Sequence, residues 1–438
     1  MKPIWHLSTA TLFVIAVLPA SAFAQDDDDP EQWIPIGGLL ADVAATGKAQ
    51  EQNTQVVANS GPTDQEIEWA RTAWSYFVAN EHPKTGLVAA VNNFNYTTLW
   101  DEGGYFLAIV AAFRLGILSE KEAKARASKA LSSLAVIPLF QGKLPNKVYN
   151  TGTLKMTDYA NKETPNSVGW SALDIMRLLS GMLVVTQQFP DLKPKAQKVI
   201  NRWDMNLLAS EGRFQGIAVN GSANNKFVQE GRIGYEQYAG VIALELGLPV
   251  ELASRYYPIL RHQRYHDILI PGDIRTEETH GVSSVTTSEP FLLEALEFGW
   301  RPASIPVARA VYEAQVFRYE QTGHLTALSE DHIKGKLYFA YNAILMDNVP
   351  FISVTAKRVN VSDKRGISTK GSFGWWALMQ DDYSQKLLNA VKLLQSDRGC
   401  YAGLFESDLS ASKILTMNTN AVVLDSLYYK NFGPLFQR

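Results

Sequence analysis

The chain has 438 residues, and its 41 lysine and arginine residues nearly balance 44 aspartate and glutamate residues, for a formal net charge of −3. Without a long basic run, this composition argues against nucleic acid as a main partner. The only cysteine, Cys400, excludes an internal disulfide, so a large hydrophobic core has to stabilise the fold.

The first 24 residues (1–24) have the pattern of a secretory signal peptide. Lys2 supplies positive charge, residues 11–19 form a short apolar core, and an Ala-Phe-Ala cleavage signal ends at Ala24. No later stretch has the apolar length of a membrane-spanning helix. We therefore expect export to a periplasm, or full secretion, without membrane insertion after cleavage. Residues 25–62, which are mostly polar and lack a period, are expected to be a flexible tether.

From residue 64 onward, apolar residues recur at helical spacing. Gly116, Gly247, Gly299 and Pro190 each separate an apolar helix from a more amphipathic one, which is typical of αα-hairpins. A helix that is apolar on all sides belongs inside a fold, and an amphipathic one belongs outside. Inner helices are predicted near residues 101–115, 171–188, 234–246, 288–298, 336–346 and 416–429. Outer helices are predicted near residues 64–80, 119–134, 193–209, 249–258, 302–320 and 382–395.

Six inner and six outer helices predict an all-α fold, an (α/α)6 toroid formed by residues 63–438 as a single domain. A stacked solenoid is the alternative, but the repeats differ too much in length and sequence. The long connections at residues 141–166, 210–232 and 262–286 would gather at one rim. Connections of this length in a compact domain are usually functional.

Three inner helices begin with a carboxylate between glycine and aromatic residues, at residues 100–105 (WDEGGY), 169–174 (GWSALD) and 234–238 (GYEQY). One such start is usually explained by the helix dipole, which favours negative charge in the first turn. Three starts far apart in the sequence favour helices that point at a common cleft. The pattern therefore indicates a carbohydrate-active helical protein.

Glycoside hydrolysis requires one carboxylic acid to protonate the leaving oxygen and one carboxylate to activate water or attack carbon. Glu236 is the leading candidate for the acid, because two tyrosines and an apolar run beside it would raise its pKa. Candidates for the base are Asp101, Glu102, Asp174 and Glu406. For the acids at helix starts, capping and the helix dipole are the alternative explanation.

Further residues are candidates for contacts with sugar rings or sugar hydroxyl groups. They are Trp100, Tyr105, Tyr149, Trp170, Tyr235, Tyr238, Glu289, Trp375, Trp376, Asn418 and Asn420. Core packing is the alternative for the aromatic residues, and capping for the polar ones. We predict no cofactor and no metal site, since Glu277, Glu278 and His280 lack a second histidine at metal spacing.

Several segments resemble the bacterial domain-of-unknown-function 3131 family. They are residues 99–104 (LWDEGG), 234–236 (GYE) and 415–424 (LTMNTNAVVL), and the likeness runs from about residue 65 to 432. More distantly, the order of elements resembles endo-β-1,2-glucanases and the glycoamylase-like domain of cyclic β-1,2-glucan synthases. This resemblance implies an (α/α)6 toroid that acts on glucans, with an acid at Glu236 and an aspartate at Asp174. The Gly-Ser-Pro-Thr-His signature of the glycoamylase-like domain is absent, since residues 246–249 (LGLP) stand there.

Our leading hypothesis is an exported glycoside hydrolase acting on a glucan or related neutral polysaccharide. A non-catalytic polysaccharide-binding protein of envelope or exopolysaccharide assembly is the alternative from another class. A polysaccharide lyase is a third hypothesis, supported by the cationic and aromatic residues 261–267 (RHQRYHD). The linkage, the stereochemical outcome and the oligomeric state are not predicted.

Overall fold

The computed structural model describes residues 61–163, 168–219, 226–280, 283–333, 339–355 and 357–437. The predicted signal peptide and nearly all of the predicted tether lie outside these ranges. Within the described ranges, no helix combines the length and the hydrophobicity needed to cross a membrane.

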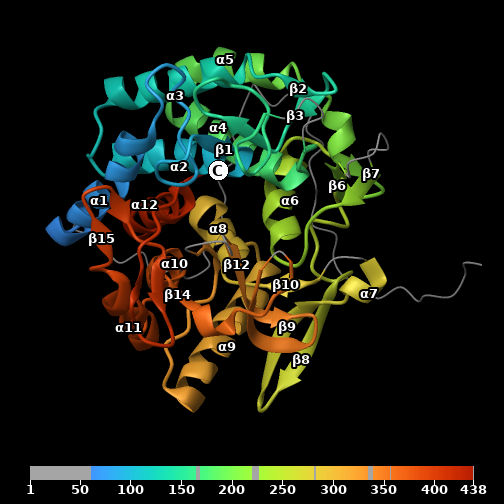
Figure 1. Ribbon diagram of the computed structural model, residues 1–438, viewed down its shortest axis with the longest axis vertical. Coiled ribbons are helices and arrows are strands. Elements are labelled where there is room, and N and C mark those ends of the chain that lie inside the picture. Colours follow the sequence, from blue (N-terminus) through green and yellow to red (C-terminus); the bar gives the residue numbers. More distant parts are fainter. Residues whose placement is uncertain are drawn as a thin grey trace, which may run out of the picture. The chain divides into compact units, whose positions relative to one another are not determined.

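Six helices form a closed inner ring (Figure 1). They are α2 (Leu99–Arg114), α4 (Ala172–Gln188), α6 (Tyr235–Glu245), α8 (Glu289–Phe298), α10 (Thr369–Met379) and α12 (Met417–Phe432). Each contacts the next along the chain, and α12 contacts α2, which closes the ring. In α8, every residue is buried, as expected of a helix that is covered on all sides.

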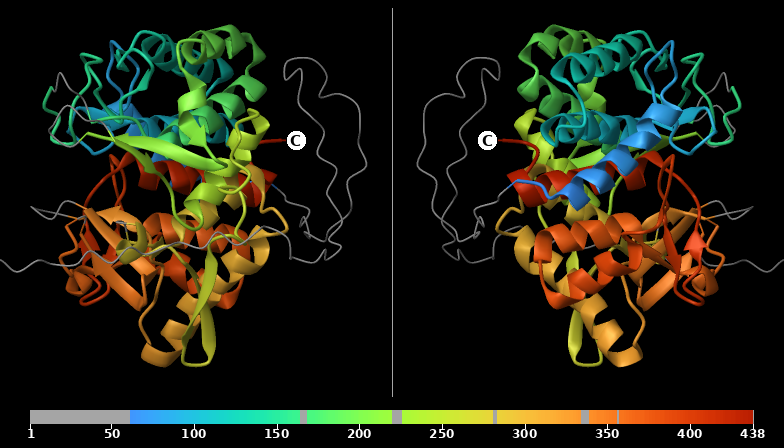
Figure 2. Two further views of the ribbon diagram at one scale, coloured as in Figure 1. Left: turned by 90° about the vertical axis from the view of Figure 1, so that its right-hand side faces the viewer. Right: turned by 90° about the vertical axis from the view of Figure 1, so that its left-hand side faces the viewer.

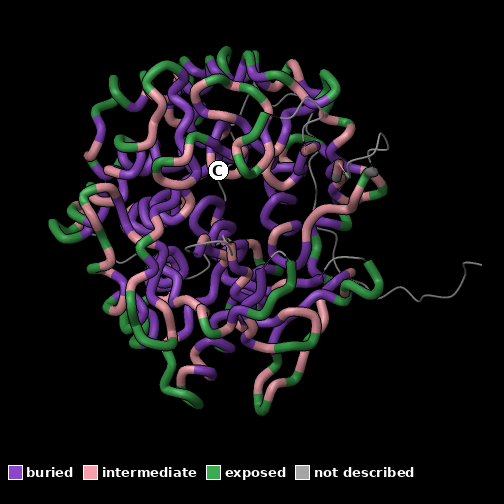
Figure 3. Tube along the Cα trace, viewed as in Figure 1, coloured by how far each residue is buried: buried purple, intermediate pink, exposed green. Residues whose placement is uncertain are grey.

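The outer helices are amphipathic and cover the ring from outside. They are α1 (Asp64–Asn80), α3 (Glu120–Leu134), α5 (Lys193–Ile200), α9 (Ser304–Thr322) and α11 (Asp382–Val391). In α3, the buried residues Ala123, Ala127, Ala130 and Leu134 share one face, while its lysines and glutamates face outward. Figure 3 shows the same contrast, with buried segments gathered in the ring and exposed ones on the outer elements.

Two predicted helices are wrong. Residues 249–258 form turns, so no outer helix follows α6. Residues 336–346 were predicted as an inner helix, but their described part is strand β12 (Phe339–Met346), and α10 takes the place in the ring. β12 pairs with β10 (Val285–Thr286), β11 (Glu330–His332) and β13 (Val349–Val354), so it lies inside a sheet, where a continuous apolar run is stable.

The long connections carry short antiparallel strands, so the all-α part of the prediction is not confirmed. The pairs and sheets are β1 (Tyr96–Thr98) with β4 (Val148–Asn150), β2 (Leu139–Phe140) with β3 (Leu144–Pro145), β5 (Ala209–Ser210) with β6 (Arg213–Ala218) and β7 (Lys226–Gln229), β8 (Leu260–Tyr265) with β9 (Ile268–Asp273), β14 (Gly366–Ser368) with β17 (Gly403–Phe405) and β18 (Ala411–Ser412), and β15 (Gln395–Ser396) with β16 (Gly399–Cys400). The β8–β9 hairpin packs beside α9, as Figure 2 shows.

Helices α2 and α4 pack with unusually close backbones. A Cβ atom on Gly103 would lie 2.5 Å from the carbonyl oxygen of Arg177, and one on Gly181 would lie 2.4 Å from the carbonyl oxygen of Gly103. Any larger residue at these positions would force the helices apart. The glycine pair at residues 103–104 therefore serves helix packing and not the approach of a ligand.

Hydroxyl caps fix where four of the inner helices begin. Thr98, Ser171, Ser368 and Thr416 each accept a hydrogen bond from a backbone N–H in the first turn of α2, α4, α10 and α12. Helix α6 begins differently, at Gly234, whose φ of 88° is in the left-handed region. These starts determine which side chains lie at the N-terminal end of the ring.

Candidate active site

A cavity of about 610 Å³ lies at the N-terminal ends of the inner helices. All six helices contribute residues from their first turn or cap, namely Thr98, Trp100, Asp101, Leu173, Asp174, Tyr235, Glu289, Lys370, Thr416 and Asn418. The remaining wall comes from strands and loops, namely Tyr96, Tyr159, Glu330, Asp331, His332, Phe339 and Tyr341. The volume is in the range of small-molecule and oligosaccharide sites.

Asp101 and Asp174 lie at the starts of α2 and α4. Asp101 accepts a hydrogen bond from the hydroxyl group of Thr98 at 2.6 Å. Burial raises the pKa of Asp101 to about 6, although the Thr98 hydrogen bond and the charges of Arg177 and Lys370 oppose the shift. Burial, together with the charge of Glu230, raises the pKa of Asp174 to about 7. Both carboxyl groups therefore titrate near neutrality.

Glu330 and Asp331 form strand β11 with His332, and all three residues line the cavity. Burial, together with the charge of Glu289, raises the pKa of Glu330 to about 8, while a hydrogen bond with Tyr235 opposes this shift. The pKa of Asp331 rises to about 7 for the same main reason. Glu330 is partly exposed to the cavity and is protonated at neutral pH, which is the state that a proton donor needs.

The pKa of Glu289 is lowered, whereas that of Glu330 is raised. The amino group of Lys370 lies 2.5 Å from its Oε2, and the amide of Asn418 donates to its Oε1 at 2.8 Å. Burial would raise the pKa of Glu289, but these two partners lower it below the usual value. Lys370 also lies 3.7 Å from Asp331 and donates to the backbone oxygen of Glu330 at 2.5 Å. Glu289 and Lys370 therefore form a buried, charged pair that braces the cavity wall.

Trp100 is the principal aromatic surface of the cavity. Its ring meets the edges of Tyr235 and Tyr238 at centroid distances of 5.7 and 5.8 Å, and the guanidinium group of Arg177 lies 4.7 Å from its centroid. Tyr159, Phe339 and Tyr341 add further rings. A wall of this kind provides flat apolar surfaces beside carboxylates, which suits the two faces of a sugar ring.

Acidic side chains outnumber basic ones around the cavity. Five carboxyl groups line it against one lysine, and that lysine is engaged by Glu289 and Asp331. Burial lowers the pKa of His332 to about 4, so this histidine is neutral. The cationic residues 261–267, which supported the lyase hypothesis, lie on or beside the β8–β9 hairpin and do not line this cavity.

Six of the predicted site residues line the cavity: Asp101, Asp174, Trp100, Tyr235, Glu289 and Asn418. The buried Oδ1 of Asn418 has no hydrogen-bond partner among the described residues. The starts of α2, α4 and α6 line one cavity, as predicted.

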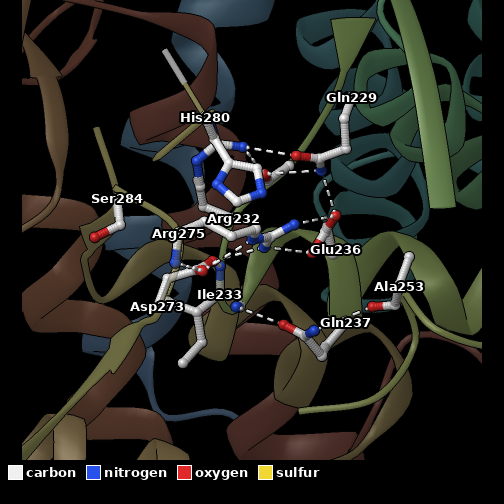
Figure 4. A network of polar contacts seen from close by, with 12 residues as sticks. Gln229, Arg232, Ile233, Glu236, Gln237, Ala253, Asp273, Arg275, His280 and Ser284 are labelled. Carbon is white, nitrogen blue, oxygen red and sulfur yellow. Dashed lines mark hydrogen bonds and ion pairs between the residues drawn. The ribbon is translucent and has the colours of Figure 1, made fainter. Parts of the chain in front are cut away.

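Glu236 does not line the cavity. Its side chain is fully buried, and Arg275 donates to its Oε1 and Oε2 at 3.1 and 2.7 Å (Figure 4). Gln229 also donates to Oε1 at 2.6 Å, and Asp273 binds the other side of Arg275 at 2.6 Å. Successive residues of a helix point about 100° apart. Since Tyr235 faces the cavity, Glu236 is turned away from it and cannot reach a ligand there.

Two other predicted acids are also engaged elsewhere. Glu102 is fully buried and accepts hydrogen bonds from the backbone of Val88 and the hydroxyl group of Thr97. Glu406 forms ion pairs with Arg318 at 2.7 Å and Arg365 at 3.1 Å. Both predictions of a catalytic role are corrected, because neither side chain lies at the cavity.

The remaining predicted sugar contacts are core residues, namely Tyr105, Tyr149, Trp170, Tyr238, Trp375, Trp376 and Asn420. Their polar atoms have internal partners in several cases: the hydroxyl of Tyr238 donates to Glu297, the indole of Trp375 donates to Ser288, and Asn420 bonds the backbone of Cys400. For these residues, core packing or helix capping was the correct alternative.

The sequence analysis missed Glu330, Asp331, His332 and Lys370. A signal was present, because two acids and a histidine stand together between two apolar stretches. It was overlooked because residues 336–346 were assigned to a helix, which left Glu330–His332 in a connection. Lys370 was missed because the helix that carries it, α10, was not predicted.

Comparisons with solved structures identify the fold. An endo-β-1,2-glucanase from Chitinophaga pinensis, solved with sophorotriose and glucose, is 12% identical, with a TM-score of 0.62 over 85% of this chain and 93% of that one. An endo-β-1,2-glucanase from Talaromyces funiculosus, solved with sophorose, is 10% identical, with a TM-score of 0.55 over 83% of each chain. A glucoamylase from Saccharomycopsis fibuligera is 8% identical, with a TM-score of 0.53 over 85% of this chain and 97% of that one. At these identities the likeness shows the (α/α)6-type fold alone.

A search of curated proteins found no match. Residues 68–433 match the family described as "Protein of unknown function (DUF3131)", which confirms the resemblance seen in the sequence. The matched segment includes all six inner helices and every residue that lines the cavity. The chain therefore belongs to the DUF3131 family.

Proposed function

We propose that this protein hydrolyses glycosidic bonds in a glucan or a related neutral polysaccharide. One observation supports this most strongly: a single aromatic-walled cavity holds a carboxyl group that is protonated at neutral pH, Glu330, and one that titrates lower, Asp101. The glucanase and glucoamylase fold of the neighbouring structures is consistent with it. The predicted signal peptide adds the proposal that the substrate is met in the periplasm or outside the cell.

In the proposed reaction, Glu330 donates its proton to the glycosidic oxygen as the bond to the anomeric carbon breaks. The ionised carboxylate of Asp101 assists the attack of water at that carbon. Asp174 lies beside Asp101 in the same wall and binds sugar hydroxyl groups, as does Asn418. Trp100 provides the stacking surface. Glu289 stays ionised and paired with Lys370, so its role is to hold the wall.

A polysaccharide panel with product analysis tests this proposal. The panel contains β-1,2-glucan, β-1,3-glucan, an α-1,4-glucan and a polyuronate, and reducing ends and product masses are measured. We expect shorter, saturated oligosaccharides from at least one neutral glucan and none from the polyuronate. Unsaturated products that absorb in the ultraviolet would instead show a lyase. Glycan binding without turnover, lost on Trp100→Ala, would show a binding protein.

A further inference from the structure

A buried ion pair lies behind Trp100, which lines the cavity. Arg177 in α4 and Glu297 in α8 have fully buried side chains, with Nη1 of Arg177 2.7 Å from Oε1 of Glu297. The hydroxyl groups of Tyr238 and Ser180 donate to Oε2 of Glu297 at 2.7 and 2.9 Å. Glu297 thus accepts hydrogen bonds from three side chains of two other inner helices, which fixes the orientation of the guanidinium group.

The guanidinium group of Arg177 also packs against the ring of Trp100. Its Cζ lies 4.7 Å from the centroid of the Trp100 ring, and Tyr235 and Tyr238 hold that ring by their edges. A desolvated cation against a tryptophan face is strongly attracted to it. The indole ring that faces the cavity is therefore held from behind by Arg177, and Arg177 is in turn held by Glu297.

Arg177 is also close in sequence to Asp174, the acidic residue of α4. It follows Asp174 by three residues, so both lie on the same face of α4, with Arg177 one turn further from the cavity. Its charge opposes the rise in the pKa of Asp101 and contributes to the lowered pKa of Glu289. The charged groups that also act on Asp101 include Lys370 from α10, Glu289 from α8, Asp174 from α4 and Glu102 from α2 itself. Two titratable tyrosines, Tyr76 and Tyr159, interact with Asp101 as well, and Asp425 of α12 interacts with Arg177.

We propose that Arg177 is a positioning residue of the cavity, which holds the Trp100 ring as a platform for a sugar and places a fixed positive charge one helical turn behind Asp101. A Cβ atom on Gly104, three residues after Asp101 in α2, would lie 3.5 Å from Nη2 of Arg177. The effect on turnover rests on the proposed function, but the effect on Asp101 does not. A buried ion pair adds little net stability over apolar side chains, because desolvation offsets the attraction. A change in the free energy of unfolding would therefore not distinguish this positioning role from a purely structural one.

The first test is a carbon-13 NMR titration of aspartate carboxyl groups in the full chain, with the Asp101 signal identified by its loss in Asp101→Asn. We expect Arg177→Met to raise the pKa of Asp101 by about one unit, because a nearby opposite charge is removed. Arg177→Lys keeps the charge and should keep most of the wild-type pKa. An unchanged pKa in Arg177→Met, or an equal shift in both variants, would overturn the proposal.

If Arg177→Met does not fold, Glu297→Gln gives an independent reading. This variant keeps the shape of the side chain but removes the negative charge that contacts Arg177, leaving only the more distant acids Asp425 and Glu289, so the pKa of Asp101 should fall. A shift in the opposite direction would contradict the electrostatic role. These titrations need no substrate, so they decide the proposal even if the protein hydrolyses no glycan.

The second test uses β-1,2-glucan as the probe and Arg318→Met as the matched control. Arg318 is also buried, forms an ion pair with Glu406 at 2.7 Å and lies 5.5 Å from the ring of Phe351, but it does not touch Trp100. We expect Arg177→Met to raise KM about fivefold through the loosened platform, and Arg318→Met to leave KM and the Asp101 titration unchanged. Equal effects of both substitutions would show a general loss of structure and overturn the assignment. If the wild type hydrolyses no glycan in the panel, the proposed function is wrong. The NMR titration of Asp101 then decides the role of Arg177 by itself.

Discussion

Glu330 and Asp101 lie in the same cavity, yet their surroundings stabilise different protonation states. Burial raises the pKa of both groups, and the charge of Lys370 opposes that rise in both. For Asp101 the charge of Arg177 opposes the rise further, whereas for Glu330 the charge of Glu289 is the main addition to burial. The pKa values of the two groups therefore separate, to about 6 and about 8. This separation is what assigns different roles to two carboxyl groups in one site.

The separation predicts a bell-shaped pH dependence of kcat/KM. Activity should rise as pH increases through about 6, because Asp101 must lose its proton to act as a base. It should fall as pH increases through about 8, because Glu330 must keep its proton to act as an acid. Initial rates on the glucan that the panel identifies provide the measurement. A profile that is flat across both values would contradict these roles.

Glu236 is expected to matter for stability and not for catalysis. In Glu236→Gln, the buried Arg275 loses one of its two charged partners, and we expect a loss of about 3 kcal/mol in the free energy of unfolding. Urea denaturation measures this. The control is Glu163→Gln, which breaks an exposed ion pair with Lys155 and should change stability very little. Equal stabilities for wild type and Glu236→Gln would show that the Arg275 pair contributes nothing.

At the residue scale, the sequence predicts well which helix turns reach the cavity. It predicts less well which side chains of those turns point into it. The motifs around Asp101, Asp174 and Glu236 all lie in first turns of inner helices, as expected. Tyr235 and Glu236 are neighbours in the motif, and only the packed helix decides which of them faces the cavity. Sequence alone does not show that Arg275, 39 residues away, binds Glu236.

At the element scale, helix starts and short turns could be predicted because their causes are local. The helix α8 ends at Gly299 as expected. The apolar stretch that includes Phe339–Met346 could not be assigned by period, since a strand inside a sheet and a buried helix are both continuously apolar. Its pairing decides the structure, because β12 lies between the neighbouring strands β11 and β13 and the distant strand β10.

The contact between α2 and α4 gives a prediction at this scale. Gly103→Ala would place a Cβ atom 2.5 Å from the backbone oxygen of Arg177, so the helices must separate, at a cost of about 2 kcal/mol. Gly104→Ala is the matched control on the same helix, since its closest contact would be 3.3 Å, to the side chain of Ala421. Thermal unfolding compares the two variants. Equal stability of both would show that α2 and α4 do not depend on this close approach.

At the scale of the whole ring, closure brings together side chains that are far apart in the sequence. Glu289 in α8 contacts Asn418 in α12 and Lys370 in α10, and none of these contacts follows from local pattern. The sequence predicted a double ring and a common cleft, because alternating apolar and amphipathic helices have few other ways to bury their faces. It did not predict the strands that complete the cavity wall, since their partners are distant in the chain.

The central claim is that this cavity, and not the Glu236 network, carries out hydrolysis. The most direct measurement is the release of reducing ends from β-1,2-glucan by wild type, Glu330→Gln and Glu236→Gln, with equal amounts of protein shown to be folded by circular dichroism. We predict that Glu236→Gln keeps activity close to wild type, while Glu330→Gln loses it by about a thousandfold because the proton donor is removed. Full activity in Glu330→Gln, or its loss in folded Glu236→Gln, would contradict the account.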